Sequence, residues 1–160
     1  MRGGALPPAL LCAALAFALS FAPSRARWSA VVALVVIATV ASLATQVVAW
    51  REGVFLGCWV SVVIAAAAVH LPGGVGPRLA ITLGINSGLW VGLVIAVAGS
   101  RLDLVKALPV VFLCVPGAWL VGSGRKIVLK VVASWLIAVS VLAASLPLVP
   151  TPGYQADHME

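Results

Sequence analysis

Residues 79–99 read LAITLGINSGLWVGLVIAVAG, an uninterrupted stretch in which no side chain carries a charge. An α-helix rises about 1.5 Å per residue, so about 20 residues cross the hydrocarbon core of a bilayer, which is about 30 Å thick. This stretch meets that length, and we therefore predict a transmembrane helix here.

Five more apolar runs surround this stretch, and short connections separate them. A short connection cannot reach a distant helix, so successive helices are expected to be antiparallel neighbours. We predict an all-α integral membrane protein, a six-helix polytopic bundle with short loops that occupies residues 1–149. A polar, flexible tail is expected over 150–160. The predicted spans are 6–22, 29–49, 53–71, 79–99, 107–122 and 127–149, with 131 as a later start for the last.

A five-helix bundle is the alternative to this count. The first run follows Arg2, has a short apolar core and ends near Ser24-Arg25-Ala26, so it also resembles a cleaved signal peptide. The fifth run is short and contains Pro116-Gly117 in its interior, where a proline kinks or breaks a helix. The sequence therefore leaves open five spans plus one cleaved or re-entrant segment.

The composition excludes other classes of protein. Hydrophobic residues make up 63% of the chain and charged residues 9%, against about half and about a quarter in soluble domains. The formal net charge is +6, but the basic residues occur singly or in pairs between apolar runs, without forming a patch. This pattern is typical of loops that face anionic headgroups, and it argues against a nucleic-acid partner.

The orientation follows from the positive-inside rule, applied to six spans. The side that carries both termini has four basic residues and the opposite side has six, so we expect both termini outside the cytoplasm. The bilayer is the expected partner, and the cytoplasmic (inner) membrane of a bacterium is the expected location. The first group is Arg2, Arg51, Arg101 and Lys106, and the second is Arg25, Arg27, Arg78, Arg125, Lys126 and Lys130.

Small residues recur every four positions in two of the runs. Residues four apart lie on one helix face, so each series forms a shallow groove that allows close backbone approach in lipid. We expect these glycine-zipper faces to pack the third and fourth helices together as a hairpin; an interface of a homo-oligomer or larger membrane complex, or a pore lining, is the alternative. The predicted packing residues are Gly53, Gly57 and Ser61 in one helix, and Gly84, Gly88 and Gly92 in the other.

Few polar residues lie inside the runs. An amide in hydrocarbon is costly unless it is paired, so each should face protein or water. They would either contact a solute in a transport pathway or form hydrogen bonds between helices. The predicted pathway residues are Asn86, Gln46, Ser42 and Thr45, with Pro116 and Gly117 at the broken helix.

Catalytic and metal-binding patterns are missing from the sequence. No Asp or Glu lies within a run, and no nucleophile is paired with a base. Cys12, Cys58 and Cys114 are far apart, with no CxxC or Cys/His cluster. We therefore expect no enzyme activity, metal or cofactor.

Two functions fit these features. The first is a permease, channel or exporter module for a small uncharged or weakly polar solute. The second is a non-catalytic accessory or assembly subunit that packs against a larger membrane complex. The broken fifth helix and the buried amides favour the first function, and the scarcity of buried polar groups favours the second.

Overall fold

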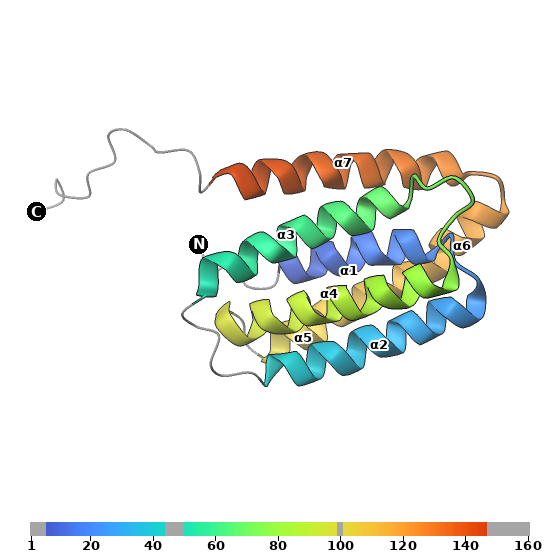
Figure 1. Ribbon diagram of the computed structural model, residues 1–160. Coiled ribbons are helices and arrows are strands. Elements are labelled where there is room, and N and C mark those ends of the chain that lie inside the picture. The colour runs from blue at the N-terminus through green and yellow to red at the C-terminus, as the bar shows by residue number, and fades with distance from the viewer. Residues whose placement is uncertain (1–5, 44–49, 99–100, 147–160) are drawn as a thin grey trace, which may run out of the picture.

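The computed structural model describes residues 6–43, 50–98 and 101–146, and every regular element in these ranges is helical. The predicted all-α bundle is confirmed. The helices alternate in direction along one common axis (Figure 1). In chain order they are α1 (Leu6–Leu19), α2 (Ser24–Ser42), α3 (Arg51–Ala68), α4 (Pro77–Ala98), α5 (Arg101–Ala107), the 3₁₀ helix η2 (Leu108–Leu113), α6 (Cys114–Gly122) and α7 (Lys126–Ser145).

Five segments are long and apolar enough to cross a membrane: α2, α3, α4, the composite Leu102–Gly122, and α7. The sixth, α1, has 14 residues, which span about 21 Å at 1.5 Å per residue. Five long segments and one shorter apolar helix agree with the five or six spans that the sequence predicted.

The helix boundaries extend beyond several of the predicted apolar runs. α2 begins at Ser24 instead of residue 29, so Arg25 and Arg27 lie in its first turn. Lys126 is likewise the first residue of α7. Charged residues therefore begin the helices here instead of lying in the loops. The predicted ends of the second and last spans (44–49 and 147–149) and the predicted tail lie outside the described residues.

The shortest of the six apolar segments, α1, occupies the centre of the bundle (Figure 1). It packs against α3, α4, η2, α6 and α7, and its Leu11, Leu15 and Leu19 side chains are fully buried. A helix surrounded by protein does not need to match the thickness of the hydrocarbon. This explains how a short helix is accommodated among longer ones.

The fifth segment is interrupted at a different place from the one predicted. The irregular stretch is η2, with Pro109 in its first turn, while Pro116 and Gly117 lie within the regular helix α6. Pro116 is the third residue of α6, where a missing N–H leaves no hydrogen bond unmade. The Pro116 ring would clash with the carbonyl group of Phe112, four residues earlier, if the α-helix continued through Phe112. The helix is therefore irregular in the residues that precede Pro116. The expected kink at Pro116-Gly117 is therefore wrong in position.

The closest helix contact joins α2 and α4, which run in the same direction (Figure 1). A Cβ on Gly84 would lie 2.5 Å from the Ala30 carbonyl oxygen, and one on Gly92 would lie 2.5 Å from that of Ala38. The backbones thus approach along a matched four-residue register. The expected partner of this glycine face was α3, and that expectation is wrong.

Candidate functional site

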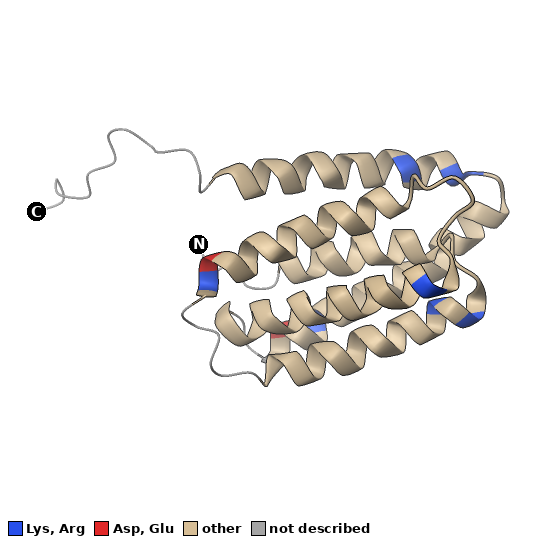
Figure 2. Ribbon diagram, viewed as in Figure 1, with Lys and Arg blue, Asp and Glu red and all other residues tan. Residues whose placement is uncertain are grey.

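The two ends of the bundle differ in charge (Figure 2). The end formed by the α1–α2, α3–α4 and α6–α7 connections is called the cationic end here. It contains Arg25, Arg27, Arg78, Arg125, Lys126 and Lys130. The acidic residues of the described ranges, Glu52 and Asp103, lie in the first turns of α3 and α5 at the opposite end.

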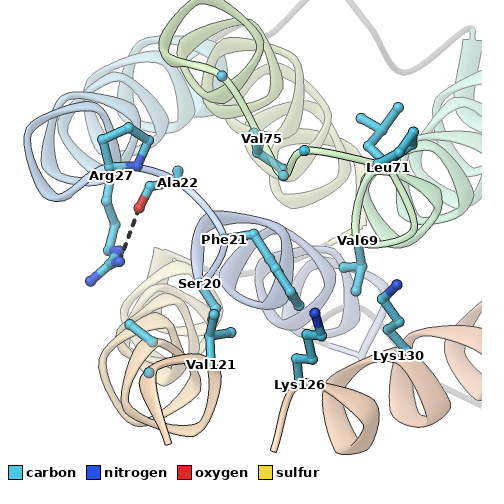
Figure 3. Close-up of a pocket in the computed structure, with 17 residues that line it drawn as sticks. Ser20, Phe21, Ala22, Arg27, Val69, Leu71, Val75, Val121, Lys126 and Lys130 are labelled. Carbon is cyan, nitrogen blue, oxygen red and sulfur yellow. Dashed lines mark hydrogen bonds between the residues drawn. The ribbon is translucent and has the colours of Figure 1, made fainter. Parts of the chain in front are cut away.

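A cavity of about 780 Å³, called the end cavity here, opens at the cationic end. Its walls come from the α1–α2 turn, the glycine-rich loop after α3, the last residues of α6 and the first turns of α7 (Figure 3). Arg27, Lys126 and Lys130 line it, and none of its described lining residues is acidic. The volume is in the range of small-molecule sites, about 300–1,000 Å³.

Arg27 is bonded to the carboxyl end of α1. Its Nε donates to the Leu19 carbonyl oxygen at 3.1 Å, and its Nη2 donates to that of Ala22 at 3.0 Å. Leu19 is the last residue of α1, and its carbonyl oxygen also accepts from the Ala22 N–H at 3.0 Å. A cation is favoured beside the carboxyl end of a helix by the helix dipole. Arg27 therefore fixes the α1–α2 turn that forms one wall of the end cavity.

The loop after α3 forms another wall. Gly73 and Gly74 have φ values of 94° and 80°, a conformation that glycine adopts without strain. A Cβ on Gly74 would also lie 3.0 Å from the Phe21 carbonyl oxygen. Glycine at this position thus lets the loop pass directly against the end of α1.

Lys126 extends from α7 toward Phe21 after the end of α1, and Lys130 extends toward Val69 after the end of α3 (Figure 3). They are four residues apart and share one helix face. Ser134, one turn further along that spacing, forms a hydrogen bond of 3.3 Å with His70 Nε2 at the end of α3. This bond joins α7 to the neighbouring helix beside the end cavity.

Asn86 lies apart from the end cavity, at the contact of α3 and α4. Its Nδ2 donates to Ser61 Oγ at 3.0 Å, and its Oδ1 accepts from Trp90 Nε1 at 3.2 Å. The Trp90 ring covers Gly57 so closely that a Cβ there would collide with it. The Asn86 amide is therefore engaged in helix packing.

The other predicted pathway residues are not gathered around Asn86. Ser42 donates to the Thr39 carbonyl oxygen at 2.7 Å within its own helix, and Thr45 and Gln46 lie outside the described residues. Pro116 is exposed, and Gly117 is buried against Ser20, whose hydroxyl a Cβ would meet. Among the described members of this set, Gly117 lies beside Ser20, which lines the end cavity.

The predicted packing residues fall into three groups. Gly84, Gly88 and Gly92 contact the backbone of α2, whereas Gly57 and Ser61 contact side chains of α4. Gly53 is exposed, and a Cβ on it would meet nothing within 4 Å.

Three cysteines are buried and free: Cys12, Cys58 and Cys114. Within the described ranges, no three His, Cys, Asp or Glu side chains are grouped so as to hold a metal ion.

No protein-family model, curated protein or solved structure matches the chain.

The residues that line the end cavity were not among the predicted site residues, although the sequence carries signals for them. The lining residues come from three separate connections, which six alternating helices bring to one end. The segment Pro72–Pro77 and the basic residues of those same connections were the available signals. Together they place a flexible backbone and positive charge at one end of the bundle.

Proposed function

We propose that the protein is a small permease, channel or exporter module whose solute enters through the end cavity. The observation that supports this most directly is the end cavity of about 780 Å³, because its volume is in the range of small-molecule sites. Its position among helix ends is common for ligand sites in bundles.

The interrupted fifth segment provides a hinge that a transport role would use. Ala118, Val121 and Gly122 of α6 line the end cavity, and η2 separates them from α5. A 3₁₀ stretch between α-helical parts is often a functional hinge. A small rotation of α6 at η2 would change the width of the cavity without moving the central helix α1.

A reconstitution experiment tests the transport proposal. Liposomes that contain the purified protein are shifted into glycerol, urea, or potassium acetate with valinomycin, and their volume is followed by stopped-flow light scattering. Transport predicts a faster volume change than in protein-free liposomes for at least one probe. An equal rate for all probes would exclude the proposal for solutes of this size.

A matched pair of variants tests whether the solute crosses the end cavity. A Cβ on Gly122, which lines the end cavity, meets nothing within 4 Å, and the same holds for Gly53 at the opposite end. Gly122→Trp should slow the flux several-fold, and Gly53→Trp should leave it unchanged. Equal fluxes for both variants would show that the solute does not cross the end cavity.

An accessory role in a larger membrane complex is the second candidate. It is favoured by a groove of about 380 Å³ between α3 and α7, lined by Trp59, Val63 and Ala144 among others, in which the buried Ser140 hydroxyl has no hydrogen-bond partner. Light scattering on particles extracted in mild detergent tests this role. A complex larger than one protomer that Ala144→Trp dissociates would support it, and a single protomer would exclude it.

A further inference from the structure

We propose that the end cavity binds a phosphate group, carried either by a free anion or by a lipid headgroup, through Lys126 and Lys130. The inference rests on the proposed function because it names the chemistry of the solute for the same cavity. It replaces the uncharged solute that the sequence suggested.

The first argument is the charge of the lining. Two lysines and one arginine line the end cavity, and none of its described lining residues is acidic. Within the described ranges the acidic residues lie at the other end of the bundle (Figure 2). A concave, low-dielectric wall of one sign concentrates counter-ions of the other sign. The ligand that fits this lining is an anion.

The second argument is the electrostatic conflict at the start of α7. Lys126 and Lys130 are like charges at i and i+4, a spacing that destabilises a helix. They also lie at the positive end of the helix dipole, where anions are favoured. α7 has no acidic residue in its first turn, and its N-cap Arg125 makes no side-chain cap hydrogen bond. A bound anion would neutralise this arrangement.

The third argument separates the roles of the three cations. Arg27 uses two of its five N–H groups on the Leu19 and Ala22 carbonyls, so it is held at the wall. The two lysines extend from α7, on the other side of the α1–α2 turn from Arg27 (Figure 3). Lys126 and Lys130 are therefore the residues that would contact the phosphate, while Arg27 adds positive potential.

The position of the end cavity makes two sources of phosphate possible. Basic pockets between transmembrane helices bind phospholipid headgroups on the cytoplasmic side, and a cavity of this volume also admits a free phosphate ester. Both sources present the same oxygens to the lysines, so the two arms of the experiment below distinguish them.

The test compares the wild type with Lys126→Gln/Lys130→Gln. In the first arm, inorganic phosphate is titrated into full-length protein in phosphatidylcholine nanodiscs, with calorimetric detection. In the second, the protein is extracted from phosphatidylcholine vesicles that contain one-fifth phosphatidylglycerol, and the retained lipid is measured by mass spectrometry. We expect a signal in at least one arm that the double variant lowers at least about tenfold, as for the loss of charge-assisted hydrogen bonds.

The matched control is Arg51→Gln/Lys106→Gln, which removes the same charge from exposed positions at the opposite end. Calorimetric binding identifies a free anion, and selective lipid retention identifies a headgroup. An equal loss in both double variants, or no signal in either arm, overturns the proposal.

Two further readouts remove ambiguity. The Lys126→Gln/Lys130→Gln variant should melt no lower than the wild type without anion, because it relieves like-charge repulsion; a lower melting temperature would assign the lysines a structural role and overturn the proposal. Phosphate binding without flux of glycerol, urea or acetate would leave this inference standing and exclude transport of those three solutes. Flux of glycerol or urea without phosphate binding would support transport and overturn the phosphate-binding inference.

Discussion

Gly88 and Leu34 are in backbone contact: a Cβ built on Gly88 would stand 2.7 Å from the Leu34 carbonyl oxygen. The two residues belong to α4 and α2, which are separated by a whole helix in the sequence. Because both partners are backbone atoms, neither can turn aside to admit a side chain. Such proximity is the main source of helix attraction in lipid, where no hydrophobic force acts between helices.

Gly88→Leu should destabilise the protein by at least about 2 kcal/mol, because overpacking forces the two backbones apart. The melting temperature in detergent should fall, while the particle mass from light scattering should stay the same, since both partners belong to one chain. Gly53→Leu, in open space, is the control. A smaller particle for Gly88→Leu would show instead that the glycine face joins two protomers.

Asn86→Leu should lower stability by about 0.5–2 kcal/mol, since it removes the hydrogen bonds to Ser61 and Trp90. A double-mutant cycle of Asn86→Leu with Ser61→Ala measures the coupling, which we expect at about 0.6 kcal/mol. Zero coupling would show that the two side chains do not interact in the membrane.

Arg27→Met should destabilise the protein by about 1–2 kcal/mol. The change keeps the apolar stem but leaves the Leu19 and Ala22 carbonyls without their charged donor. Thermal melting in detergent at low ionic strength measures the loss. Arg25→Met, at an exposed position in the same helix turn, should change the melting temperature little. A similar fall in melting temperature for both variants would indicate a general effect of charge and not the loss of the Arg27 hydrogen bonds.

Cysteine labelling should place the two bundle ends on opposite sides of the membrane. Ser123→Cys lies at the cationic end and Gly53→Cys at the other, and both positions are exposed, whereas the native cysteines are buried. With an impermeant maleimide, Gly53→Cys should react in intact cells and Ser123→Cys only after permeabilisation, because the positive-inside rule assigns the cationic end to the cytoplasm. Labelling of both from the same side would contradict the alternating topology.

Some features followed from the sequence because they depend on local composition. The apolar run at residues 79–99 predicted α4 (Pro77–Ala98) to within two residues, since the length and hydrophobicity of a single segment decide whether it can span a bilayer. The four-residue spacing of Gly84, Gly88 and Gly92 likewise established that they share one face, because helical periodicity is local. Asn86, two residues from both Gly84 and Gly88, lies on another face for the same reason.

Other features were decided by the tertiary structure, because they depend on which segments meet. Glycine spacing does not reveal its partner, and the face of α4 packs on Ala30, Leu34 and Ala38 of α2 instead of on α3. The Ala26-x₃-Ala30-x₃-Leu34-x₃-Ala38 series in α2 is an equally regular match that was overlooked. The end cavity combines the α1–α2 turn, the loop after α3 and the ends of α6 and α7. These connections are far apart in the sequence, and none of them indicates a site by itself. They meet at the end cavity because alternating helices fold around the buried α1.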